Sequence, residues 1–320
     1  MVEIREAPPE NEARADDVPL SAKEKAEQVW LEILIWKSVR HEIVLITGAG
    51  SGIGRLLALR FARLGSQVVM WDVDKAGLDA TMEVLQKDPE ANSANVKEPS
   101  RPHASFVVDL TKREDVYRVA ELVQREVGDV DILINNAGVV TGRRFLDCPD
   151  ELIDRTVGVN TLAHFWTIKA FLPSMESRNH GHIVSVSSSA GLFGVPKLAD
   201  YCASKFGAVG LIESLFAEYR TMKLDGVNFT VVCPFFINTG LFDGVTTVYP
   251  TILPILEADY ATDKIMEAIL TNQSYLMMPR FIYFVYFLKG FLPIEAAMRL
   301  AHFFGATRSM ESFKGRQQPH

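Results

Sequence analysis

Short apolar runs alternate with amphipathic stretches along most of the chain. Continuous apolar runs of about four to eight residues are typical of buried strands, whereas apolar residues recurring about every three or four positions indicate helices that pack on one side. The stretch 112–127 shows the second pattern, with valines on one face and Gly128 just beyond its end. Strands are predicted at 42–47, 67–71, 104–108, 131–135, 182–187, 227–232 and 274–278, and helices at 52–64, 112–127, 150–176 and 199–220.

This alternation of strands and helices predicts the fold class. Consecutive parallel strands need crossover connections, which helices supply, and the crossovers are right-handed. The sequence therefore predicts an α/β fold, a single Rossmann-type doubly wound parallel sheet flanked by helices. At 320 residues, one large domain with tails fits better than two domains.

The two ends of the chain differ from this regular middle. Residues 1–40 combine an acidic, proline-bearing tail, expected to be disordered, with an amphipathic helix predicted at 22–40. The main domain is predicted at 41–279. Residues 280–320 form a tail with the aromatic run Phe281–Leu288, predicted to face a membrane or another subunit.

Neither apolar end segment is long enough to cross a membrane, which takes about 20 apolar residues. Glu32 interrupts the first segment, between Val29 and Trp36. This segment either packs on the main domain or lies flat in a membrane interface. The aromatic run is a membrane surface patch or the mouth of a lipid site, with a dimer interface or a core helix as the alternative. No secretory signal is expected, because no basic start precedes an apolar core.

Composition narrows the classes of partner. A net charge of −7 argues against nucleic acid as a partner. The three cysteines, Cys148, Cys202 and Cys233, imply no disulfide framework and suit a reducing, cytosol-facing location. His180 and His182 flank a glycine before a strand, and we interpret them as turn residues. No metal site is predicted.

A glycine-rich turn follows the strand predicted at 42–47 and opens the helix at 52–64. Its glycines are Gly48, Gly52 and Gly54. Glycines let the backbone approach a pyrophosphate, and the helix N-terminus adds N–H groups and a positive dipole end. The context of strand, turn and helix predicts a dinucleotide site, with a turn that binds no ligand as the alternative.

Asp72 ends the next strand, close to the position, about 20 residues on, where an acidic residue holds the ribose hydroxyls of a dinucleotide. A carboxylate there repels the 2′-phosphate of NADP. Neither Ser51 nor Val73 supplies a compensating arginine. The predicted cofactor is therefore NAD, unless Asp72 is an ordinary residue at a strand end.

Tyr201 and Lys205 lie four residues apart, and Ser188 precedes them. Residues i and i+4 share a helix face, so the ammonium can lie beside the phenol. A phenol has a pKa of about 10, which a neighbouring cation lowers. Ser188 could then hold a substrate oxygen while Tyr201 takes or gives its proton. This arrangement predicts the interconversion of an alcohol and a carbonyl.

These motifs together resemble the short-chain dehydrogenase/reductase family. The resemblance runs from about residue 42 to residue 279. Besides the glycine turn and the Tyr201/Lys205 pair, it rests on segments in the family's order and spacing: Asp109-Leu110, Asn135-Asn136-Ala137-Gly138, Asn160 and Pro234–Thr239.

The resemblance implies a role for each matched residue. Tyr201 resembles the general acid/base, Lys205 its partner that also binds ribose, and Ser188 the serine that binds the substrate oxygen. Asn160 matches the asparagine of the proton relay. The family's glycine after Pro234 is Phe235 here. The matched cofactor-binding residues are Gly48, Ser51, Gly52, Ile53, Gly54, Asp72, Asp109, Leu110, Asn136, Gly138, Tyr201, Lys205, Pro234, Ile237 and Thr239.

A closer resemblance, to the 16C group of that family, implies the substrate. Members of this group include retinol dehydrogenases and lipid-droplet 17β-hydroxysteroid dehydrogenases. The resemblance implies an NAD-dependent enzyme for a lipophilic alcohol, all-trans-retinol first and a 17β-hydroxysteroid or other lipid alcohol second. The segments that carry it are Trp71-Asp72, Phe145–Leu152, His164–Thr167, Lys169–Pro173 and Asn179–His182.

Three further expectations concern partners. Residues 235–258 occupy the family's substrate-lid position and are rich in apolar side chains, which fits a bulky hydrophobic alcohol. We expect peripheral, cytosol-facing association with the endoplasmic reticulum membrane, with a lipid droplet or the cytoplasm as alternatives, and a homodimer stays open. The non-enzymatic alternative is an NAD-binding scaffold on a lipid surface, which would be expected to have lost a catalytic residue.

Overall fold

The computed structural model describes residues 36–92 and 102–315. The predicted tail 1–20 and most of the helix predicted at 22–40 lie outside the described residues. The described end of that helix, residues 36–40, is not helical, so the prediction is wrong there. Val39 is instead buried against the main domain, where its carbonyl accepts a hydrogen bond of 2.8 Å from the Ser66 hydroxyl.

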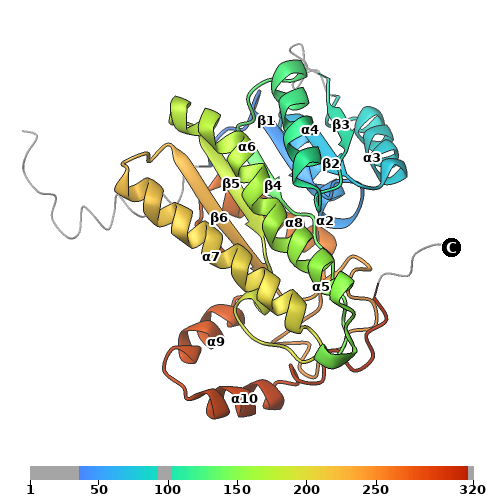
Figure 1. Cartoon of the computed structure of the whole chain (residues 1–320), viewed down its shortest axis with the longest axis vertical. Coiled ribbons are helices and arrows are strands. Elements are labelled where there is room, and N and C mark those ends of the chain that lie inside the picture. Colours follow the sequence, from blue (N-terminus) through green and yellow to red (C-terminus); the bar gives the residue numbers. More distant parts are fainter. Residues whose placement is uncertain (1–35, 93–101, 316–320) are drawn as a thin grey trace, which may run out of the picture. The chain divides into compact units, whose positions relative to one another are not determined.

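Seven parallel strands form the central sheet in the order β3-β2-β1-β4-β5-β6-β9, which confirms the predicted fold class (Figure 1). Most of these strands are buried on both faces, which is why they read as continuous apolar runs. The strands are β1 Ile43–Thr47, β2 Gln67–Asp72, β3 Ala104–Val107, β4 Ile132–Asn135, β5 Gly181–Val186, β6 Val227–Pro234 and β9 Tyr275–Met278, with a separate pair β7 Ile237–Asn238 and β8 Leu256–Glu257.

Helices cover both faces of the sheet. Side chains of α4, α6 and α7 share one buried cluster with the sheet, and those of α2, α3 and α8 share a second. Figure 1 shows the first group in front of the sheet and α2 and α8 behind it. The bounds are α2 Gly52–Arg63, α3 Lys75–Lys87, α4 Arg113–Glu126, α5 Asp150–Val157, α6 Ala163–Arg178, α7 Ala199–Thr221 and α8 Ala258–Leu270.

Three features of these elements differ from the sequence prediction. The helices α3 and α8 were not predicted. The helix predicted at 150–176 divides into α5, a π-helical turn at Gly158–Leu162, and α6. His182 lies within β5 and is fully buried, so its interpretation as a turn residue is wrong.

The aromatic run forms α9 Phe281–Lys289, which is followed by α10 Ile294–Phe303. Both lie below α7, at the bottom of the view in Figure 1. Large apolar side chains on these helices and the turn between them are exposed, among them Phe284 (55%), Phe287 (63%) and Phe291 (73%). Within residues 36–92 and 102–315, no helix combines the length and apolar character that a membrane span requires.

Candidate active site

The predicted catalytic residues converge near the carboxyl ends of β4, β5 and β6. Tyr201 and Lys205 lie in the first two turns of α7, and Ser188 opens the short 3-10 turn after β5. Asn160 lies in the π-helical turn, a local irregularity that is common at functional sites. Tyr201, Lys205, Ser188 and Asn160 are all buried.

Tyr201 and Lys205 share one face of α7, as the spacing predicted. The Lys205 ammonium lies 5.7 Å from the centroid of the Tyr201 ring. Its Nζ donates a hydrogen bond of 2.8 Å to the carbonyl oxygen of Val186 at the end of β5. The strand end thus fixes the lysine beside the phenol, and Ser188 lines a pocket together with Tyr201.

The predicted lowering of the Tyr201 pKa is wrong for this structure. Burial raises the pKa of Tyr201 far above its ordinary value, and the hydrogen bond with Ser188 opposes that rise only in part. Burial also lowers the pKa of Lys205 to about 8. Both side chains are buried, and burial disfavours the charged form of each, the phenolate of Tyr201 and the ammonium of Lys205.

Asn160 links the π-helical turn to the loop after β4. Its Oδ1 accepts a hydrogen bond of 2.9 Å from the Val139 N–H, and its Nδ2 donates to the Val139 carbonyl (2.9 Å) and to the Ser204 hydroxyl (3.1 Å). A Cβ at Gly138 would lie 3.5 Å from Asn160 Oδ1 and 3.6 Å from Lys205 Nζ. Gly138 therefore lies in ordinary contact distance of both the asparagine and the lysine.

The glycine turn is packed too closely for side chains. A Cβ at Gly54 would lie 2.2 Å from the carbonyl oxygen of Gly48, which itself has φ +67°. Asn136 clamps this turn, since its Nδ2 donates to the Thr47 carbonyl at 2.9 Å. The first turn of α2 thus comes close to the loop after β4, as the predicted dinucleotide site requires. Of the other predicted residues here, Ser51 precedes α2, and Ile53 is buried in its first turn.

Further predicted cofactor residues lie around this turn. The Asp72 carboxylate accepts a hydrogen bond of 2.9 Å from the Gly50 N–H, which places it at the edge of the turn. At Gly52, a Cβ would lie 3.4 Å from the Thr239 side chain, so the stretch with Ile237 lies nearby. Backbone N–H groups, glycines without side chains and a carboxylate thus meet at one place, and this set fits a dinucleotide.

Three predicted cofactor residues lie in other surroundings. The Asp109 carboxylate accepts hydrogen bonds from the Thr111 hydroxyl (2.6 Å) and N–H (3.1 Å), which lower its pKa. Leu110 points its side chain into the core, so any contact of this residue with a cofactor falls to its backbone. Pro234 ends β6 opposite Met278.

An apolar pocket opens beside Tyr201, with a cavity of about 30 Å³. The predicted lid, residues 235–258, contributes Phe235, Phe236 and Phe242 to the wall of this pocket. The Phe242 ring meets that of Tyr201 edge to face, with centroids 5.6 Å apart. Phe235 stands where the family has glycine, and its N–H donates to the Met278 carbonyl at 2.7 Å.

Sequence reasoning missed one part of this pocket. Ala306 and Ser309, from the segment after α10, also line it. We call residues 304–315 the C-terminal strap. No spacing or motif indicated it, because the contacts join positions far apart in the chain, such as Lys197 and Met310.

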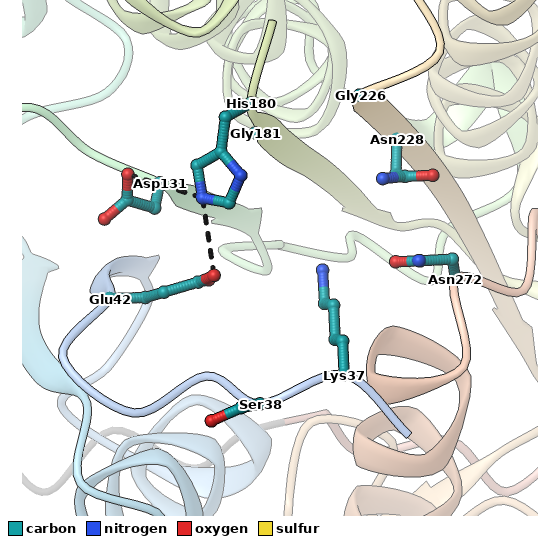
Figure 2. Close-up of a pocket in the computed structure, with 9 residues that line it drawn as sticks. All are labelled: Lys37, Ser38, Glu42, Asp131, His180, Gly181, Gly226, Asn228 and Asn272. Carbon is teal, nitrogen blue, oxygen red and sulfur yellow. Dashed lines mark ion pairs between the residues drawn. The ribbon is translucent and has the colours of Figure 1, made fainter. Parts of the chain in front are cut away.

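A second cavity, of about 260 Å³, lies at the amino-terminal ends of the central strands, opposite the candidate active site (Figure 2). In Figure 2, His180 points toward Glu42, 3.4 Å away. Lys37 enters from another side in the same view. Its Nζ lies 2.8 Å from Nδ1 of His182, which the figure does not draw. Burial lowers the pKa of Lys37 to about 8. None of the predicted site residues lines this cavity, and the described residues contain no metal-binding cluster.

Comparisons with known proteins agree with the motifs. A family model described as short chain dehydrogenase matches residues 42–248. The chain is 55% identical over 282 residues to epidermal retinol dehydrogenase 2 of Mus musculus, with 88% of each chain covered. It is 47% identical over 282 residues to short-chain dehydrogenase/reductase family 16C member 6 of Bos taurus, with 88% of this chain and 86% of that protein covered.

A solved structure shares the fold. It is a short chain dehydrogenase/reductase from Burkholderia phymatum in complex with NAD, with a TM-score of 0.68 and 24% identity. The match covers 89% of this chain and 99% of that one. At this identity, the likeness supports the fold alone.

Proposed function

The chain belongs to the short-chain dehydrogenase family, and from this premise we propose that it interconverts a lipophilic alcohol and its carbonyl with NAD. The foremost substrate is all-trans-retinol, which would be oxidised to all-trans-retinal. The observation that carries the proposal is the apolar pocket that meets Tyr201 and Ser188. A phenol and a hydroxyl at the end of an aromatic pocket suit an alcohol with a large hydrocarbon part.

The chain's residues supply binding, orientation and proton transfer. Bound NAD would supply the hydride acceptor. Ser188 holds the substrate oxygen, and Tyr201 exchanges a proton with it. Because burial raises its pKa, Tyr201 is protonated at neutral pH, which is the state of the proton donor in carbonyl reduction. Oxidation starts from the other protonation state, in which the Tyr201 phenolate accepts the hydroxyl proton of the alcohol through the same contact. Lys205 would hold the ribose beside them.

The test is an alcohol panel. NADH fluorescence is followed with all-trans-retinol, a 17β-hydroxysteroid and a long-chain fatty alcohol, each delivered in the same detergent. We expect the highest kcat/KM with retinol. A higher kcat/KM with the steroid than with retinol would assign the protein as a 17β-hydroxysteroid dehydrogenase instead. No turnover with any of the three would favour an NAD-binding scaffold instead.

The cofactor preference forms a separate prediction, supported by the Asp72 carboxylate at the edge of the glycine turn. We expect a higher kcat/KM with NAD than with NADP, because the carboxylate repels the 2′-phosphate. The variant Asp72→Ala combined with Val73→Arg should narrow or reverse the preference. Asp74→Ala, two residues further along, is the matched control. Equal use of both cofactors by the unchanged protein would contradict the assignment.

We also propose that the protein works as a peripheral protein on the cytosolic side of the endoplasmic reticulum membrane. The exposed aromatic surface of α9, α10 and the turn between them supports this proposal. Several large apolar side chains exposed on neighbouring elements are costly in water and mark an interaction site. A membrane would cover it and would also hold the water-insoluble substrate. A lipid droplet offers the same chemistry.

The membrane proposal is tested by changing Phe284, Phe287 and Phe291 together to serine. Each exposed aromatic side chain that leaves the lipid loses about 1.5 kcal/mol or more, so the three together should weaken vesicle binding about a thousandfold. Flotation with phosphatidylcholine vesicles measures it. Tyr260→Ser, on α8, is the control for an exposed aromatic elsewhere. The surface is instead an oligomer interface if the unchanged protein does not float with the vesicles and the triple variant has a smaller molecular mass in solution, measured by light scattering, than the unchanged protein.

A further inference from the structure

The C-terminal strap is fastened to the catalytic domain at several points. Lys197 Nζ donates to the Met310 carbonyl at 3.3 Å. The Thr246 N–H donates to the Ser309 carbonyl at 3.2 Å, and the Lys314 N–H donates to the Asp243 carbonyl at 2.9 Å. Two of these contacts reach the lid, so lid and strap form one layer over the pocket.

Two glycines leave the space into which the strap fits. Gly142 has φ +68°, and a Cβ there would lie 2.0 Å from the Phe313 ring. Gly244 has φ +84°, and a Cβ there would lie 2.2 Å from the Ser312 carbonyl oxygen. The catalytic domain and the lid thus lack side chains where the strap packs, which marks its seating as a specific contact.

The strap reaches the catalytic tyrosine through apolar contacts. Met310 is 2% exposed and belongs to the same buried cluster as Tyr201. The Phe313 ring lies 6.3 Å from that of Phe242, which in turn contacts Tyr201 at 5.6 Å. Met310 therefore packs in the buried cluster behind the pocket, next to the lining residue Ser309, and Phe313 supports the Phe242 ring that contacts Tyr201.

The free cavity beside Tyr201, about 30 Å³, is far smaller than the roughly 300 Å³ or more of an ordinary ligand pocket. A bulky alcohol therefore has to displace side chains of the lid or the strap. Displaced apolar side chains lose their buried contacts unless the hydrocarbon part of the alcohol replaces them. Long apolar alcohols can do so, and short ones cannot.

We propose that Met310 and Phe313 determine the substrate specificity of the site by occupying, in the resting protein, the space that a long apolar alcohol takes. The inference rests on the proposed function, since it concerns the alcohol of that reaction. Removing these side chains makes displacement unnecessary. Short alcohols then gain access, and the advantage of long alcohols shrinks.

The experiment compares Met310→Ala and Phe313→Ala with the unchanged protein, using all-trans-retinol and cyclohexanol. The ratio of kcat/KM for retinol to that for cyclohexanol should fall about tenfold in each variant. Met222→Ala, at the end of α7, and Phe165→Ala, on α6, are exposed positions outside the strap, the pocket and the aromatic surface of α9 and α10; they are the matched controls and should leave the ratio unchanged. Lys197→Met removes one hydrogen bond to the strap without altering the pocket wall. It should also lower this ratio of kcat/KM values, and it serves as the test where an alanine variant fails to fold.

Two outcomes separate this inference from the proposed function. If the unchanged protein oxidises retinol and the ratio stays the same in the strap variants, the inference is wrong and the function stands. If no alcohol is oxidised, the proposed function fails, and binding of the apolar dye 1-anilinonaphthalene-8-sulfonate tests the strap. Stronger binding by the strap variants than by the controls supports a cavity filled by Met310 and Phe313. Equal binding overturns the inference.

Discussion

Replacing Tyr201 with phenylalanine is expected to lower kcat by about 10²–10⁴-fold, the range that a positioned proton-transfer group contributes. The change removes one oxygen and keeps the ring. The edge-to-face contact with Phe242 at 5.6 Å should therefore survive, and so should the fold. NAD binding should also persist, since the glycine turn and Asp72 are untouched. Stopped-flow or steady-state NADH fluorescence with retinol measures the loss.

Tyr260→Phe serves as the matched control, because Tyr260 is half exposed on α8, away from the pocket. It should retain full activity. Circular dichroism and NAD titration of both variants separate a catalytic loss from unfolding. Normal turnover by Tyr201→Phe would remove the tyrosine from the proposed proton transfer and shift attention to Ser188.

The relation of Tyr201 to Lys205 shows how far sequence reasoning extends. Helical spacing is a local property, and it correctly predicted that the two side chains share a face of α7. The electrostatic consequence depends on water, which the chain excludes through residues far away in the sequence. Phe242 in the lid and the strap beyond it help to bury the phenol, so the pKa moves opposite to the expectation. The i, i+4 spacing predicts which side chains lie next to each other, but it does not predict how far they are exposed to water.

The fold likewise has features that local sequence predicts and features that depend on residues far apart in the chain. The buried strands were predictable because apolar runs such as Ile43–Thr47 have no other place than the interior of a parallel sheet. The glycine turn was predictable because its sequence matches its strand and helix context. The C-terminal strap was not, since the Lys197–Met310 contact joins residues 113 positions apart and no periodicity records it. The π-helical turn at Gly158–Leu162 was hidden inside a continuous helical pattern.

Two buried histidines should make the protein sensitive to acid. His164, on α6, meets the Ser185 hydroxyl at 3.0 Å, and His182, on β5, meets the Thr230 hydroxyl at 2.8 Å. Burial is the main cause of a lowered pKa in both, to about 3 for His164 and well below the ordinary value for His182. The neighbouring ammonium groups of Lys205 and Lys37 lower the two values further. Both rings stay neutral in the folded state at mildly acidic pH.

In the unfolded chain both histidines bind a proton near pH 6.5. Below that pH the unfolded state therefore binds more protons than the folded state, and stability falls as the pH falls. Each group contributes up to about 1.4 kcal/mol per pH unit. Between pH 6.5 and 5.0, the two together should lower the free energy of unfolding by roughly 3 kcal/mol. Urea unfolding at a series of pH values measures this change.

His164→Gln keeps a polar side chain but removes one titrating ring. The variant starts from a lower stability, so the informative quantity is the slope of the unfolding free energy against pH. This slope should fall by no more than about half, because His182 and also His103, whose pKa burial lowers, keep their contributions. His302→Gln, on the exposed surface of α10, is the control and should keep the slope. An unchanged slope in His164→Gln would assign the acid sensitivity to other groups, because a histidine that titrates alike in both states contributes nothing to it.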